Sequence, residues 1–126
     1  MLHHLTLWVP DLERAARPWG WLLGELGYER DAGADELLLF RRDGFALVLE
    51  QSADMVPGML YSRLRPGMNH LALVVSGPGR LARMEADAPD HGWTVLTSDR
   101  HQVAGDAEVV FLEDPAGFEV ELVAPV

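Results

Sequence analysis

The stretch MLHHLTLWVPDL, residues 1–12, is informative about the fold because a related stretch, NHLALVV, recurs at residues 69–75. Each contains a histidine followed by alternating apolar residues, a pattern typical of a half-buried β-strand. Neighbouring side chains of a strand point to opposite faces, so only one of His3 and His4 can repeat the role of His70. The recurrence predicts two copies of one structural unit.

The elements that follow these two stretches come in the same order. In the first copy we predict a strand, a helix and three further strands, at residues 3–9, 12–26, 28–31, 35–42 and 45–51. The second copy repeats this order at residues 68–75, 78–91, 93–98, 107–113 and 118–124. The sequence therefore predicts an α+β fold of two βαβββ modules, which form a curved mixed sheet around a concave groove.

Residues 52–67 contain proline and glycine without a sustained period and are predicted to be a connector. The domain organisation is then one domain over residues 1–126, with module one at 1–51 and module two at 68–126. In the first helix, Asp11 is placed to act as the N-cap, and Pro18 predicts a kink or a break.

Strand alternation assigns side chains to faces. In the first strand the leucines face the helix, which leaves His4, Thr6 and Trp8 on the groove side. The same rule, applied to the fourth, fifth and last strands, adds these groove-facing residues: Glu50, His70, Ala72, Val74, Glu119 and Glu121. His4 is then the partner of His70, and His3 is the bystander.

Composition sets limits on function. The chain has 126 residues, of which 48% are hydrophobic and 24% charged, as in an ordinary soluble globular protein. It contains neither cysteine nor lysine, which excludes thiolate and Schiff-base chemistry. The net charge of −10 argues against nucleic acid or an anionic membrane as a partner. We expect a cytoplasmic protein that handles a small molecule.

Two imidazoles and two carboxylates on one surface suit a divalent metal ion. Zn²⁺, Ni²⁺, Co²⁺, Mn²⁺ and Fe²⁺ all accept such ligands and leave positions open for water or substrate. The alternative is a set of hydrogen-bonded surface histidines and solvated glutamates. Because the four residues occur at matching places in two repeats, we favour the metal site.

Two motifs resemble the vicinal oxygen chelate superfamily. They are His-x-x-Leu-x-Val-x-Asp-Leu at residues 4–12 and Asp-Pro-x-Gly-x-x-Val-Glu at residues 114–121. The resemblance covers essentially the whole chain. The superfamily includes glyoxalase I, extradiol dioxygenases, fosfomycin-thiol transferases, methylmalonyl-CoA epimerase and metal-free bleomycin-binding proteins, and the motifs do not specify one reaction among these.

The resemblance implies metal ligands and a base. The ligand positions correspond to His4, Glu50, His70 and Glu121, and in glyoxalase I the last-strand carboxylate also moves a proton beside a chelated carbonyl. It implies a glyoxalase-like lyase or isomerase that acts on a small oxygen-chelating substrate. Short two-module members commonly pair as homodimers, so we also expect a homodimer.

Four further residues are predicted to bind substrate. Thr6 matches a threonine of the fosfomycin enzymes, and Trp8 is placed to stack on a substrate or to pack into the wall. Arg100 and His101 would hold an anion over the groove, although a solvated loop fits them equally well.

Two other functions stay open. One is an antibiotic- or metabolite-binding protein without turnover, whose known metal-free examples have typically lost the histidines. The other is a thiol transferase of the fosfomycin-resistance kind, although VAGDAEVVFLEDP at residues 103–115 lacks the Ser- and Gly-rich potassium loop of those enzymes.

Overall fold

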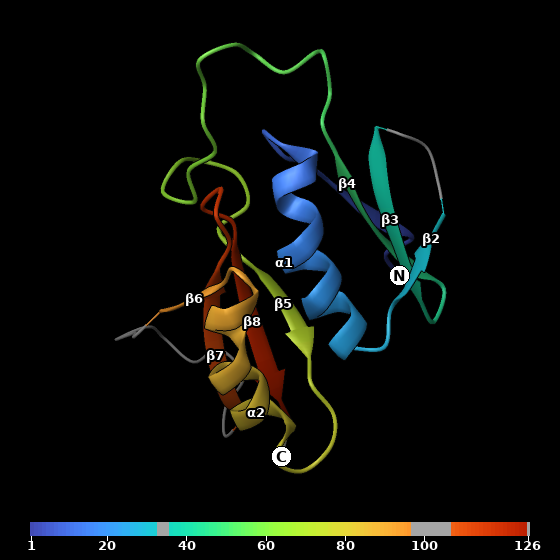
Figure 1. Cartoon of the computed structure of the whole chain (residues 1–126), viewed down its shortest axis with the longest axis vertical. Helices are drawn as coiled ribbons and strands as arrows, with labels where there is room; N and C mark the ends of the chain where they lie inside the picture. Colours follow the sequence, from blue (N-terminus) through green and yellow to red (C-terminus); the bar gives the residue numbers. More distant parts are fainter. Residues whose placement is uncertain (33–35, 97–106, 126) are drawn as a thin grey trace. The chain divides into compact units, whose positions relative to one another are not determined.

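Both predicted modules are present in the computed structural model, which describes residues 1–32, 36–96 and 107–125. The chain divides into two units, Met1–Leu60 and Tyr61–Val126, and each contains the order βαβββ (Figure 1). Each unit has one mixed four-stranded sheet, so the predicted fold class is confirmed.

The first unit is built around the sheet β1-β4-β3-β2. Its elements are β1 (His4–Trp8), α1 (Leu12–Glu25), β2 (Glu29–Asp31), β3 (Leu37–Arg42) and β4 (Phe45–Glu50). β1 runs parallel to β4, whereas β3 is antiparallel to both β4 and β2. Asp43 and Gly44 both have positive φ, as the predicted tight turn between β3 and β4 requires.

Helix α1 begins after Asp11, whose side chain accepts a hydrogen bond from the Arg14 backbone N–H at 3.0 Å. The helix ends before Gly27, which takes a left-handed φ of 83°. Of the kink or break predicted at Pro18, the break is wrong, because the helix continues through this residue. Pro18 is buried on the helix face that packs against the sheet, beside Trp19, and this burial offsets the backbone hydrogen bond that proline cannot donate.

The second unit is built around the sheet β5-β8-β7-β6, in which β5 runs parallel to β8. Its elements are β5 (Leu71–Val74), α2 (Arg80–Asp87), the 3₁₀ helix η1 (Ala88–His91), β6 (Thr94–Leu96), β7 (Glu108–Glu113) and β8 (Glu119–Ala124). Gly92 ends the helical segment with a φ of 88°, as its position predicted. The predicted strand at 93–98 extends into residues 97–106, which lie outside the described ranges.

Burial along the two outer parallel strands follows the predicted alternation. In β1, Leu7 is buried, whereas His4, Thr6 and Trp8 are exposed. In β5, Leu73 is buried between exposed residues in the same way. The strands β4 and β8 each have a neighbour on both sides, and their side chains are mostly buried on both faces.

The predicted core tryptophans behave differently from one another. Trp19 and Trp93 are buried, in the first and second unit respectively. Trp21, also predicted to be core, is only half-buried, because it is two residues from Trp19 and points away from the buried face of α1. Within the described ranges, no helix has the length and apolar character needed to cross a membrane.

Candidate metal centre

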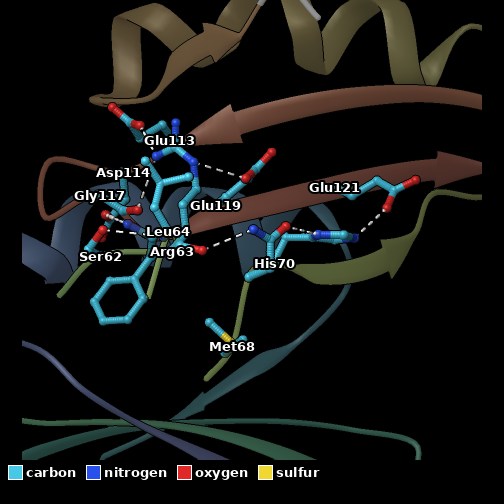
Figure 2. Close-up of polar contacts among 12 residues, drawn as sticks. Ser62, Arg63, Leu64, Met68, His70, Glu113, Asp114, Gly117, Glu119 and Glu121 are labelled. Atoms are coloured by element: carbon cyan, nitrogen blue, oxygen red, sulfur yellow. Dashed lines mark hydrogen bonds and ion pairs between the residues drawn. The ribbon is translucent and has the colours of Figure 1, made fainter. Parts of the chain in front are cut away.

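The second unit brings one pair of predicted ligands together. His70 immediately precedes β5, and Glu121 lies on the adjacent strand β8. The His70 Nε2 and Glu121 Oε2 atoms are 3.0 Å apart (Figure 2). The Glu121 side chain is almost fully buried, whereas that of His70 is 32% exposed. A buried carboxylate therefore faces an imidazole nitrogen at the edge of solvent.

The other nitrogen of the His70 ring is held by a short chain of hydrogen bonds. Asn69 Nδ2 donates to the Arg63 backbone carbonyl at 3.0 Å, and Asn69 Oδ1 lies 2.8 Å from His70 Nδ1. A carbonyl can only accept, so it fixes which end of the Asn69 amide carries the donor. The Asn69 oxygen must then accept a proton from His70 Nδ1, and Nε2 is the nitrogen directed at Glu121.

Arg63 itself is anchored by two carboxylates. Its guanidinium pairs with Glu113 and lies 3.2 Å from Glu119 Oε2 (Figure 2). Glu119 has no exposed surface and shares a face of β8 with Glu121, so its charge requires a nearby cation. The sequence interpretation missed Arg63 because it lies in the aperiodic connector. The available signal was Glu119, a predicted groove-side carboxylate without an assigned cation.

The Asp-Pro-x-Gly motif stabilises the turn that starts β8. Asp114 is buried, and its Oδ1 accepts hydrogen bonds from the backbone N–H groups of Ala116 at 2.9 Å and Phe118 at 2.8 Å. The Phe118 ring stacks on Tyr61, with ring centroids 4.1 Å apart. This turn fixes where β8 begins and so positions Glu119 and Glu121.

Tyr61 also ties the connector to the start of β5. Its hydroxyl donates a hydrogen bond to the Met68 backbone carbonyl. Burial raises the pKa of the Tyr61 phenol above its ordinary value, against the smaller lowering effect of Arg63. The hydroxyl therefore stays protonated as a donor at neutral pH.

The first unit does not bring its two predicted ligands together. In the parallel register of β1 and β4, His4 is opposite Ala46 and Glu50 is opposite Trp8. Four residues of strand separate the two positions, about 13 Å at roughly 3.3 Å per residue.

The two units differ at the position that corresponds to Glu121. Leu71 is opposite Val120 in the register of β5 and β8, so His70, one residue earlier, is opposite Glu119. Glu121 therefore lies two residues beyond the position opposite His70. Applied to the first unit, the same offset from Ala46 reaches Val48. Glu50 lies two residues further on. Strand parity predicted the face of Glu50 but not its position along the strand.

The remaining predicted residues have varied placements. Thr6 is exposed and opposite Val48, and Trp8 is 47% exposed. Arg100 and His101 lie outside the described residues. His3, predicted to be a bystander, contacts the ligand candidate beside it: the Nδ1 atoms of His3 and His4 are 2.8 Å apart.

The geometry of His70 and Glu121 fits two ligands of one ion. Ligand atoms about 2.1 Å from a metal lie roughly 3.0 Å apart at a right angle and roughly 3.4 Å apart in a tetrahedron. Among the described residues of either unit, no three His, Cys, Asp or Glu side chains form a group that could hold a metal ion. The second unit thus supplies two ligand candidates, and a complete centre requires at least one more.

The paired βαβββ modules, with histidine and glutamate on adjacent parallel strands, define the vicinal oxygen chelate class. A profile of the glyoxalase/bleomycin resistance protein/dioxygenase superfamily matches residues 3–111, and the chain belongs to this superfamily. Its members are often enzymes and often use divalent metals.

Individual relatives agree with this assignment. The uncharacterized protein YqjT of Bacillus subtilis strain 168 is 40% identical over 126 residues, which cover 98% of each chain. The crystal structure of a candidate glyoxalase from Bacillus halodurans is similar with a TM-score of 0.87 and 35% identity, over 99% of this chain and 96% of that one. A glyoxalase/bleomycin resistance protein from Albidiferax ferrireducens T118 shares the fold, with a TM-score of 0.76 and 16% identity, over 99% and 98% of the two chains.

Proposed function

We propose that this protein is a divalent-metal-dependent enzyme of the glyoxalase type, a lyase or isomerase that acts on a small oxygen-chelating substrate. The observation that carries the proposal is the contact of 3.0 Å between His70 Nε2 and Glu121 Oε2. Superfamily membership supports it, because metal-dependent members use histidine and glutamate ligands at the matching motif positions.

The proposed centre uses His4, His70 and Glu121. His4 occupies in the first unit the place that His70 occupies in the second, beside the start of a parallel strand pair. Glu50 is left out because Val48 occupies the position that matches Glu121. Three protein ligands leave open positions for two substrate oxygens.

Each residue of the proposed centre would then have a separate role in the reaction. A divalent ion at this centre would polarise the two bound oxygens of the substrate. The Glu121 carboxylate would accept the proton from the adjacent carbon, because it is a buried carboxylate in contact with His70. The exposed Trp8 ring would cover the apolar part of the substrate.

Metal binding tests the ligand assignment. We expect Glu121→Gln to lower the affinity for Zn²⁺ or Ni²⁺ by about 100-fold or more, above the 10–100-fold cost typical of an outer-shell partner. The matched control is Glu50→Gln, which makes the same chemical change on the other parallel pair and should alter affinity by less than about 3-fold. Isothermal titration calorimetry measures both. Equal losses in the two variants would restore Glu50 to the ligand set.

Proton exchange tests the reaction. The metal-loaded protein should exchange the C–H proton of an α-hydroxycarbonyl or a thiol–aldehyde adduct with solvent deuterium, followed by NMR. Removal of a proton-transfer base costs about 10²–10⁴ in rate, so Glu121→Gln should reduce exchange by that factor even at saturating metal. Exchange at the wild-type rate in this variant would move the base elsewhere.

A second function, ligand binding without turnover, is favoured by the exposed apolar side chains on the histidine-bearing strands. Trp8 is 47% and Val74 55% exposed, on the same strand faces as His4 and His70. Such side chains suit a bulky apolar ligand. Tight binding of an aromatic natural product, with no proton exchange under any added metal, would establish this function instead.

A further inference from the structure

The residue that precedes each ligand histidine contacts its ring in the same way. In the second unit, Asn69 Oδ1 lies 2.8 Å from His70 Nδ1. In the first unit, His3 Nδ1 lies 2.8 Å from His4 Nδ1. Both contacts are made to the Nδ1 atom. The two modules therefore repeat a contact as well as a histidine.

We propose that Asn69 and His3 are positioning residues, each of which holds the Nδ1 proton of the following histidine and so leaves Nε2 as the nitrogen that can bind a metal ion. A neutral imidazole carries one proton, and a hydrogen bond at one nitrogen determines which nitrogen is left as the acceptor. Metal-binding histidines typically donate their other ring N–H to a carbonyl or carboxylate, which fixes the tautomer and the ring orientation.

Asn69 imposes this state because its own orientation is fixed. Its Nδ2 donates to the Arg63 carbonyl at 3.0 Å, so its oxygen is the atom that faces His70. The Arg63 side chain is in turn held by Glu113 and Glu119. Figure 2 shows this continuous chain of contacts, from the two carboxylates through Arg63 to the imidazole of His70.

His3 can perform the same task with a different group. If its Nδ1 is unprotonated, it accepts the proton of His4 Nδ1, and the two rings lie edge to face with centroids 5.1 Å apart. An imidazole nitrogen can also donate, whereas an amide oxygen only accepts. His3 therefore permits the required tautomer of His4, and Asn69 enforces that of His70.

The tautomers are measurable without metal. Long-range ¹H–¹⁵N correlation spectra of the metal-free protein in weakly alkaline solution, where an unperturbed imidazole is neutral, assign the protonated nitrogen of each histidine. We expect Nδ1–H for His70 in the wild type. Asn69→Leu should shift His70 towards Nε2–H, whereas Asn69→Asp keeps an acceptor oxygen and should retain Nδ1–H. Ser62→Ala is the control, because the Ser62 hydroxyl accepts a local backbone hydrogen bond from Leu64.

Two variants of His3 test the proposal in the first unit. His3→Asn places there the residue that the second unit uses, and it should keep His4 in the Nδ1–H form. His3→Ala removes the acceptor and should release it. A wild-type His70 without a proton on Nδ1 would overturn the proposal, as would unchanged protonation of Nδ1 in folded Asn69→Leu.

The consequence for affinity rests on the proposed metal function. Asn69→Leu should weaken Zn²⁺ or Ni²⁺ binding by about 10–100-fold, and Asn69→Asp should recover most of it. The tautomer spectra and the metal affinities test the two proposals independently. Expected tautomers in a wild type that binds no metal would refute the metal function and leave the positioning role intact, whereas metal binding that ignores both Asn69 variants would refute the positioning role in binding.

Discussion

At the residue scale, Asp114 shows how the side chain of a motif residue can act by binding backbone groups. Its buried carboxylate accepts two backbone hydrogen bonds within the β7–β8 turn. Its backbone N–H donates to the Phe118 carbonyl at 2.9 Å, which closes the turn a second time. The start of β8, and with it the position of Glu121, depends on this one side chain.

Replacing Asp114 should therefore destabilise the protein. Asp114→Ala leaves the N–H groups of Ala116 and Phe118 without their acceptor, at about 1–3 kcal/mol for the buried Phe118 group and less for the half-buried Ala116 group. We expect a loss of about 2–4 kcal/mol in the free energy of unfolding, measured with urea. The control Asp54→Ala changes an exposed turn aspartate and should stay within about 0.5 kcal/mol. An equal effect in both variants would contradict the role given to Asp114.

At the residue level, the sequence predicts the faces of side chains but not their positions relative to residues on other strands. Parity along a strand is a local property, so the exposed side of His4 and the buried side of Leu73 followed from alternation. The offset of Glu50 from His4 depends on the register between strands more than forty residues apart, which alternation does not determine. The role of Asn69 depends on a carbonyl in the aperiodic connector.

At the element scale, helix α1 is fixed at its start by two side chains. Asp11 accepts from the Arg14 N–H at 3.0 Å, and Gln51 Oε1 accepts from the Leu12 N–H at 2.8 Å. The first of these was predicted from the sequence. The second joins Gln51, the residue after β4, to the start of the helix.

Removal of the cap should weaken the first unit. Asp11→Ala should lower the free energy of unfolding by about 0.5–2 kcal/mol, because a helix N–H loses its acceptor. Asp11→Asn keeps an acceptor of similar shape and should be close to neutral. Thermal unfolding followed by circular dichroism compares the two. If Asn is as damaging as Ala, the charge of Asp11 rather than its hydrogen bond is what matters.

Element boundaries were predictable where single residues determine them. Gly27, Gly92 and the Asp43-Gly44 pair each take the positive φ that ends a helix or turns a hairpin. Pro18 did not break its helix, since burial against the sheet outweighs a local preference. The predicted strand 68–75 is shorter in the structure and spans Leu71–Val74. The Met68 carbonyl accepts a hydrogen bond from the Tyr61 hydroxyl, and the Asn69 side chain contacts the His70 ring.

At the scale of the whole molecule, the predicted connector belongs to two units. The division falls between Leu60 and Tyr61, and the part after it is held to the second unit by Tyr61 and Arg63. Large apolar side chains are nevertheless exposed along the connector. They are Val56, Met59, Leu60 and Leu64, with exposures from 63% to 87%. Large apolar side chains exposed in this way favour burial against another chain.

We therefore expect a homodimer, with the connector in its interface. Light scattering at micromolar concentration should report about twice the chain mass of 14.0 kDa. Leu64→Glu places a charge on the most exposed of these side chains and should shift the protein towards the monomer, because burial of an unpaired charge is costly. The matched control is Ala53→Glu, which adds the same charge at an exposed small residue of the connector. A monomeric wild type that still binds metal would show that this surface serves another purpose and that the site needs no second chain.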